Sequence, residues 1–434
     1  MFAYYLHLAL RSLRRNWIMT ALMVLAIGLG IGASMTMLTV LHVMGGHPLP
    51  GRSAHLYRPH IDPLPADMKA DGDWDPSDNF TWPDAMALLQ AHKAPHQAAM
   101  SGGRVLVHPP AAGARPFFVN GRYATADFFA MFGVPFVAGH AWSAAADEHC
   151  ARVVVLDEAL ARRVFGGIDV VGQSLRLGEH AFRVIGVTAH WQPQPLFYAD
   201  ASASAFGRGD RFFLPLATAH ELQLDVAGNI STWVEGKSDL GGASTSWLQL
   251  WVELDTPAQV AAYRQFLHDY SAQQKALGRF ERPPSSARLY SLAQWLDHEN
   301  LVPGDVRLQA WLAFGFLLVC LVNIMALLLA KFLRRSGEVS VRRALGARRR
   351  DVFVQFGVES AAVGVAGGAL GLAVAQLGLW SVRQRPDDYA HLAQMDAGML
   401  LGTFLLAIVA SLLAGLLPAW RACHVPPALH LKTL

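Results

Sequence analysis

Four long apolar runs stand out in the hydropathy pattern of this chain. The first covers residues 18–43 and holds no Asp, Glu, Lys or Arg. An α-helix rises about 1.5 Å per residue, so about 20 apolar residues cross the hydrocarbon layer of a membrane. Three further runs, at residues 308–333, 352–382 and 399–420, meet the same requirement. The pattern therefore predicts four transmembrane helices.

The first run has an alternative interpretation as a secretory signal peptide, because Arg11, Arg14 and Arg15 precede it. The apolar core of a signal peptide is only about 7–15 residues long, so we expect an uncleaved span. Residues 1–17 place leucines at helical spacing. This spacing predicts either an amphipathic helix along the inner membrane surface or a plain extension of the first span.

A hydrophilic segment of about 264 residues, 44–307, separates the first two spans. Its pattern predicts short strands mixed with helices. We expect strands at 152–156, 174–177, 181–186 and from 247 onward, the last with one aliphatic face, and helices at 158–165 and 258–275. The fold class expected is a membrane protein with four transmembrane α-helices and a large α+β extracytoplasmic domain inserted between helices 1 and 2.

The positions of basic residues predict the orientation of the spans. The loop between spans two and three carries eight cations and two acids. The cations are Lys331, Arg334, Arg335, Arg342, Arg343, Arg348, Arg349 and Arg350. Segment 44–307 instead holds 21 Lys and Arg against 27 Asp and Glu. We therefore expect both termini, including the tail 421–434, and loop 334–351 to be cytoplasmic. Segment 44–307 and the short link 383–398 are expected outside.

Composition agrees with a membrane protein and indicates no chemistry of its own. Hydrophobic residues make up 53% of the chain, and the net charge of +3 is too small to indicate nucleic-acid binding. Partial matches to calcium, zinc, hydrolase and nucleotide motifs each lack a required residue; the acidic stretch after Asp71, for example, has Pro76 where a calcium loop needs glycine. We expect no catalytic residue, metal site or bound cofactor in this chain.

Small residues inside the spans predict close helix packing, because they let two backbones approach in lipid. The positions are Gly28 and Gly32 in the first span, Gly364, Gly368 and Gly371 in the third, and Ser411 and Gly415 in the fourth. Their partners are expected within the chain or across an oligomer; the plainer alternative is that glycine is common in membrane helices.

One acid, Glu359, lies inside the third span, about two helical turns beyond Asp351. An ionisable side chain within a membrane segment is a candidate functional group by default. We expect it to reach the cytoplasmic interface or to pair with an arginine of the preceding loop.

The basic loop 334–351 allows two interpretations. Its charge alone suits binding to acidic lipids. Its internal order, however, places an apolar edge and a glycine stop among the arginines, which suits docking of another protein. Charge and pattern do not decide between these two.

The loop also resembles a family signature. Residues 338–347, read as E-V-S-V-R-R-A-L-G-A, are similar to the E-I-x-I-R-R-A-L-G-A signature of the FtsX/MacB permease family, and the stretches 118–139, 153–187 and 417–432 resemble further motifs of that family in the same order. Two positions depart from it: Val170 follows Asp169 where proline is usual, and His140 stands where arginine is common.

The resemblance implies a permease of the bacterial inner membrane that works as a dimer with a second copy or a paralogue. It implies a separate ABC ATPase, of the MacB or LolD kind, that binds ATP and Mg and meets a set of coupling residues: Glu338, Val339, Val341, Arg342, Arg343, Leu345, Gly346 and Ala347. It also implies an outer domain of two parts, a porter-like part at 44–115 and 215–300 and an inserted part at 116–214.

In such permeases, movement is expected to pass along the helices to the outer domain. The implied function is export of peptides, antibiotics or other amphiphiles. The implied partners are a periplasmic adaptor (a membrane fusion protein), an outer-membrane channel and membrane lipids. Alternatives are extraction of lipoproteins or lipids from the inner membrane, and signalling to a periplasmic cell-wall hydrolase or sensor. A further alternative, an anchored periplasmic enzyme, would need only one span and a catalytic site. The sequence instead predicts four spans and no catalytic site.

Overall fold

The computed structural model divides the chain into two compact units. We call residues 1–44 with 302–434 the helical unit, and residues 45–301 the sheet domain. The structure describes residues 11, 15, 17–45, 48–68, 78–111, 113–199, 205–207, 209–234, 239–301, 304–334, 337, 341, 346, 348–384, 395 and 397–424. Each unit is considered by itself.

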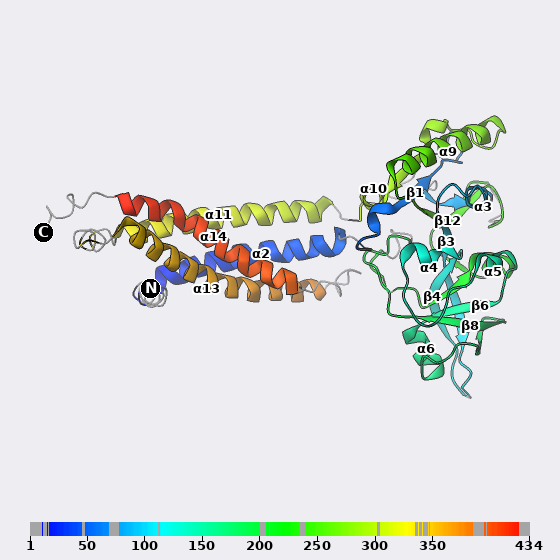
Figure 1. Ribbon diagram of the computed structural model, residues 1–434, viewed down its shortest axis with the longest axis horizontal. Coiled ribbons are helices and arrows are strands. Elements are labelled where there is room, and N and C mark those ends of the chain that lie inside the picture. Colours follow the sequence, from blue (N-terminus) through cyan, green and yellow to red (C-terminus); the bar gives the residue numbers. More distant parts are fainter. Residues whose placement is uncertain are drawn as a thin grey trace. The chain divides into compact units, whose positions relative to one another are not determined.

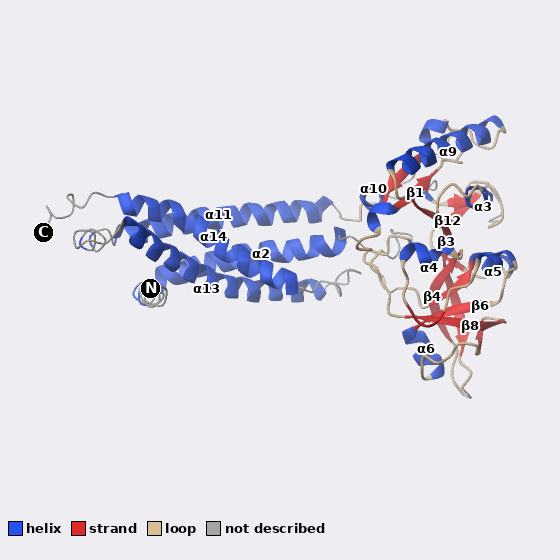
Figure 2. Cartoon of the chain, in the orientation of Figure 1, coloured by secondary structure: helices blue, strands red, loops and turns tan. Residues whose placement is uncertain are grey.

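The helical unit contains four long helices that run side by side (Figures 1 and 2). They are α2 (Trp17–Gly45), α11 (Gly304–Arg334), α13 (Arg349–Arg383) and α14 (Ala397–His424). All four are long and apolar enough to cross a membrane. The four predicted spans are therefore confirmed, whereas most of the predicted N-terminal helix, of loop 334–351 and of link 383–398 lies outside the described residues.

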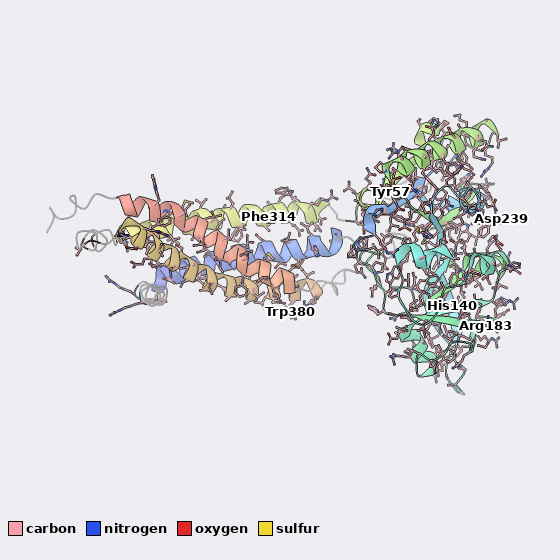
Figure 3. All side chains as sticks on the ribbon, in the orientation of Figure 1. Tyr57, His140, Arg183, Asp239, Phe314 and Trp380 are labelled. Carbon is pink, nitrogen blue, oxygen red and sulfur yellow. The ribbon has the colours of Figure 1, made fainter. Side chains whose placement is uncertain are left out.

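Large apolar side chains cover the outside of the helical unit. Phe314 and Trp380, labelled in Figure 3, are 39% and 57% exposed, and Trp311 is 73% exposed. Apolar faces of this extent are unfavourable in water. Inside, Ile27, Ile31 and Ile324 belong to a buried core shared by the helices. This distribution suits a bundle surrounded by hydrocarbon.

The sheet domain is built on one sheet of mixed direction. Its main path has the order β13-β1-β12-β3-β4-β9-β6-β8-β5, in which β4 pairs parallel with β9 and β6 with β8. The strands are β1 (Leu56–His60), β2 (Phe80–Thr81), β3 (His96–His108), β4 (Phe117–Ala124), β5 (Phe136–Gly139), β6 (Val153–Asp157), β7 (Ser174–Leu177), β8 (His180–Thr188), β9 (Phe212–Pro215), β10 (Val226–Ala227), β11 (Ser231–Thr232), β12 (Thr245–Glu253) and β13 (Arg288–Ser291).

Helices cover both faces of this sheet, and a buried core fills each side. They are α3 (Trp82–Gln90), α4 (Asp127–Phe132), α5 (Ala144–Glu148), α6 (Glu158–Phe165), α8 (Leu216–Glu221), α9 (Pro257–Ala276) and α10 (Leu292–His298), with short 3-10 turns η1 (Ser53–His55) and η3 (Pro284–Ser286). Because alternate residues of a strand point to opposite faces, Leu250 enters one core while Trp251 enters the other. An α/β domain inserted between the first and second apolar helices is confirmed.

Local sequence signals account for several of these elements. Asp157 caps α6 by accepting a hydrogen bond from the Leu160 amide at 2.7 Å, and Gly166, at φ 83°, ends the helix in a left-handed conformation. The predicted strands and helices of the domain are confirmed to within a few residues. The expectation for β12 was incomplete. The strand has the expected aliphatic face, but it is buried on both faces, since Trp247 and Gln249 are also at most 1% exposed.

The division of the domain into two parts stays a prediction. Strands from 117–215 lie toward one end of the main path, and β1, β12 and β13 lie toward the other. The long strand β3 pairs with both β12 and β4, so the two sets share one sheet.

A carboxyl group in α5 makes the stability of the sheet domain depend on pH. Asp147 accepts a hydrogen bond from the Ala126 amide at 2.6 Å, and its other oxygen is shielded from solvent. Burial raises the pKa of Asp147 from 3.8 to about 7, more than that hydrogen bond lowers it. The folded domain thus keeps a proton that the unfolded chain loses between pH 3.8 and about 7.

The contribution of this carboxyl to stability is therefore fully present below pH 3.8 and lost as the pH rises through about 7. We expect Asp147→Asn to be more stable than the wild type near pH 8, by at most about 4 kcal/mol, and nearly equal to it near pH 4. Thermal unfolding followed by tryptophan fluorescence measures both differences. Glu179→Gln, at an exposed carboxylate that does not act on Asp147, is the matched control and should show no such dependence. An Asp147→Asn difference that is the same at both pH values would contradict this.

Candidate functional site

The helical unit contains a buried ion pair near the ends of two helices. Nζ of Lys331, at the end of α11, lies 2.5 Å from Oε1 of Glu359 in α13. The side chains are 0% and 1% exposed. The sequence pattern predicted Glu359 inside the span, paired with an arginine of the loop or at the interface, and counted Lys331 among the loop charges; the structure instead buries Lys331 in the bundle, where it pairs with Glu359.

Apolar and small residues enclose this pair. The rings of Phe332 and Phe356 stack at 4.0 Å, again joining α11 to α13. Next to Glu359, the carbonyl of Ser360 accepts a hydrogen bond from the Ser411 hydroxyl of α14. A side chain at Gly415 would collide with the Ser360 hydroxyl, so glycine is required there for this contact. Three helices thus meet around the pair.

Removing charges from water is costly, and an apolar isostere of such a pair is often as stable. The pair is therefore better explained by the position that it fixes. It joins the last turn of α11 to α13 about 12 Å beyond Asp351, and the predicted coupling loop connects these two helices.

Most predicted coupling residues cannot be placed. Glu338, Val339, Arg342, Arg343, Leu345 and Ala347 lie outside the described residues. Of the remaining two, Val341 is 48% exposed, and Gly346 has a φ of 99°, a conformation that side chains with a Cβ rarely adopt. Their role in coupling stays a prediction.

The predicted small residues lie at helix contacts within the chain. A Cβ on Gly364 would come within 2.8 Å of Ser411, and one on Gly368 within 2.9 Å of Ala407, both in α14. In α2, added Cβ atoms on Gly28 and Gly32 would meet Leu370 and Val374 of α13, and Gly371 faces the Gly28 carbonyl. The backbone of α13 therefore approaches both α2 and α14 closely.

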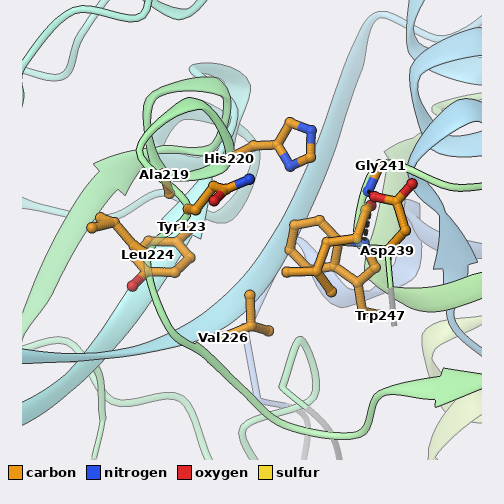
Figure 4. Close-up of a pocket in the computed structure, with 10 residues that line it drawn as sticks. Tyr123, Ala219, His220, Leu224, Val226, Asp239, Gly241 and Trp247 are labelled. Atoms are coloured by element: carbon orange, nitrogen blue, oxygen red, sulfur yellow. Dashed lines mark hydrogen bonds between the residues drawn. The ribbon is translucent and has the colours of Figure 1, made fainter. Parts of the chain in front are cut away.

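The sheet domain has a pocket of about 360 Å³ that sequence analysis did not find. It is lined by residues from β4, α8, the turns that follow α8, β10, the turn before β12, and β12: Tyr123, Ala219, His220, Gln223, Leu224, Val226, Asp239, Leu240, Gly241 and Trp247. Figure 4 shows Tyr123 and Leu224 on one side and Asp239, Gly241 and Trp247 on the other. No short motif carries these residues, which come from positions 123 to 247.

Within the described part of the chain, no group of three or more His, Cys, Asp or Glu side chains is placed to hold a metal ion. The candidate sites are thus the ion pair with its adjoining loop and the pocket. Among the described residues of these two sites, no nucleophile lies beside a base.

Comparison with known families identifies the class of protein. Residues 20–269, more than half of the chain, match the MacB-like periplasmic core domain, and residues 310–427 match the FtsX-like permease C-terminal family. The chain belongs to the FtsX/MacB-like family of ABC transporter permeases, as its motifs predicted. With four helices able to span a membrane, it is a multi-pass inner-membrane protein.

Similar proteins include two named exporters. The pyoverdine export ATP-binding/permease protein PvdT of Pseudomonas entomophila (strain L48) is 24% identical over 359 residues, which are 81% of this chain and 48% of that protein. The macrolide export ATP-binding/permease protein MacB of Escherichia coli O157:H7 is 26% identical over 313 residues, 69% of this chain and 41% of that protein. The chain spans less than half the length of these curated relatives.

Among solved structures, the periplasmic region of MacB from Actinobacillus actinomycetemcomitans is similar to this chain, with a TM-score of 0.36 and 14% identity. The match covers 59% of this chain and 94% of that one.

Proposed function

We propose that this chain is the permease of a MacB-type export system, in which an ABC ATPase on a separate subunit drives movement of the sheet domain. The cargo would be peptides, antibiotics or other amphiphiles. The observation that carries the proposal is the match of both family domains in order, together with the buried pair that joins the two helices beside the coupling loop. The export names of PvdT and MacB favour outward transport.

In this scheme, both termini and loop 334–351 face the cytoplasm, and the sheet domain lies in the periplasm. The charge distribution supports that orientation. ATP and Mg bind to the ATPase, which presses on the loop. The Lys331–Glu359 pair then makes α11 and α13 move together, and the helices carry the movement to the sheet domain. A second permease copy or paralogue, a periplasmic adaptor and an outer-membrane channel would complete the assembly.

A change at Leu345 separates ATPase docking from simple lipid binding by the loop. Leu345→Arg adds positive charge, so a loop that only binds acidic lipids should lose nothing. If the loop docks an ATPase through its apolar edge, a charge there should weaken binding by about tenfold or more, as expected for a central interface residue. Copurification with an ABC ATPase of the MacB or LolD kind, and ATP turnover by the complex, measure the effect.

The matched control is the double change Arg348→Gln and Arg350→Gln, which removes two charges and leaves the apolar edge. It should weaken binding to acidic vesicles and retain the ATPase. If no ATPase copurifies with the wild type, or if Leu345→Arg leaves turnover unchanged, the proposal is wrong. Copurification of a membrane fusion adaptor supports export, whereas a lipoprotein carrier in its place would point to extraction from the inner membrane.

A further inference from the structure

The pocket in the sheet domain has the size of a small-molecule site. Its volume of about 360 Å³ lies within the range of about 300–1,000 Å³ that is usual for such pockets. Two of its lining residues, Tyr123 and Trp247, are packed in the domain at 0% and 1% exposed, whereas His220, Leu224 and Val226 are partly exposed and can contact a ligand.

Hydrogen bonds already made within the domain hold the two buried aromatic residues. The Tyr123 hydroxyl donates to the carbonyl of Asp225 at 2.9 Å, and Nε1 of Trp247 donates to the carbonyl of Leu240 at 2.9 Å. The polar atoms of both rings are therefore already paired within the domain. Leu224 and Val226 add aliphatic contacts.

Three rings, those of Trp82, His220 and Trp247, pack against one another at the pocket. His220 lies on Trp82 with ring centroids 3.9 Å apart, and Trp82 is nearly parallel to Trp247 at 6.1 Å. Burial lowers the pKa of His220 below 6.5, more than the nearby Asp239 raises it. At neutral pH the imidazole is therefore uncharged and does not repel a cation.

The rim carries a negative charge. Of the ten described residues that line the pocket, Asp239 is the one that is charged at neutral pH. Its Oδ1 accepts a hydrogen bond from the Gly241 amide at 3.0 Å, which fixes the carboxylate beside the opening (Figure 4). A pocket that places the aliphatic side chains of Leu224 and Val226 near the exposed carboxylate of Asp239 is complementary to a cation on a small apolar body.

We propose that this pocket binds a small organic cation, an amine with an aromatic or aliphatic body. The body would lie against the partly exposed Leu224, Val226 and His220, and the ammonium group would face Asp239. This site does not depend on ATPase coupling, so it stands or falls separately from the proposed function.

Fluorine NMR of the full-length chain in detergent tests this with two probes of similar size and opposite charge, 4-fluorophenethylamine and 4-fluorophenylacetate. We expect saturable binding of the amine and no saturable binding of the acid. Asp239→Asn should weaken amine binding by roughly three- to tenfold, the effect of losing one partly exposed charge contact. Leu224→Trp should abolish it by filling the pocket.

Glu179→Gln, an exposed carboxylate in the turn between β7 and β8, is the matched control and should bind the amine as the wild type does. Because Asp239 is also exposed, neither charge change should impair folding, and Leu224→Trp is checked by thermal unfolding. Absence of saturable amine binding, equal binding of both probes, or equal losses from Asp239→Asn and Glu179→Gln would each overturn the proposal.

Discussion

Replacing Lys331 with methionine should destabilise the helical unit by about 3–5 kcal/mol, because it leaves the buried Glu359 carboxylate without the ammonium group beside it. Methionine has nearly the length of lysine, so the loss of charge dominates over the loss of volume. The unfolding transition of the purified chain in detergent, followed by helical circular dichroism, measures the change.

Removal of both charges should reverse most of this loss. The double change Lys331→Met and Glu359→Leu leaves no buried charge from the pair, and apolar replacements of buried ion pairs are often neutral or stabilising. The exposed pair Glu158–Arg162, at 2.7 Å on α6, provides the matched control. There Glu158→Gln should cost no more than about 0.5 kcal/mol. If Lys331→Met costs as little as this control, or if the double change is no more stable than the single one, an unpaired buried charge does not explain the stability of the helical unit.

The double change also distinguishes stability from coupling. If the pair only stabilises the bundle, the double variant should restore ATP turnover together with stability. If the pair sets the relative position of α11 and α13, as we propose, stability returns and stimulated turnover stays low. The two measurements on one variant therefore separate a structural contact from a positioning one.

Much of this fold could be predicted from short-range patterns. The four spans follow from runs of apolar residues, and α6 follows from a capping aspartate and a terminal glycine at the right spacing. These signals depend on neighbours within about one helix length. The family motifs, which are also short and ordered along the chain, carried the family assignment.

Long-range contacts were not predictable in the same way. The partner of Glu359 lies 28 positions earlier at Lys331, and only the packing of α11 on α13 reveals it. The sequence pattern counted this lysine with the loop cations because charge near a span end usually lies outside the membrane. The sheet order places β12 between β1 and β3, so the Trp247 side of the pocket comes from a strand far along the chain from Tyr123.

The small-residue positions show an intermediate case. Spacing indicated which faces pack, but it left the partner open, because a glycine stripe fits a helix of the same chain or of another copy. The structure resolves this for Gly364 and Gly368, which face Ser411 and Ala407 of α14. These positions therefore allow a direct test of packing within one chain.

Gly368→Leu should separate α13 from α14 and destabilise the helical unit by about 1–3 kcal/mol, as overpacking of a close contact does. The physical reason is that even a Cβ at this position would lie 2.9 Å from the Ala407 Cβ, with the Phe404 ring at 3.4 Å. A leucine has no low-energy conformation in that space, so the helix backbones must move apart. The chain's unfolding temperature in detergent should fall accordingly.

Gly357→Leu is the matched control, since it makes the same chemical change on the same helix at a position where an added Cβ meets nothing within 4 Å. There we expect a neutral or slightly stabilising effect, because leucine favours a helix over glycine by roughly 0.5–1 kcal/mol. A loss of stability at Gly368 and a gain at Gly357 would show that the effect comes from the α13–α14 contact and not from the helix propensity of leucine. Similar changes at both would mean that the close approach of the two helices does not hold in the protein.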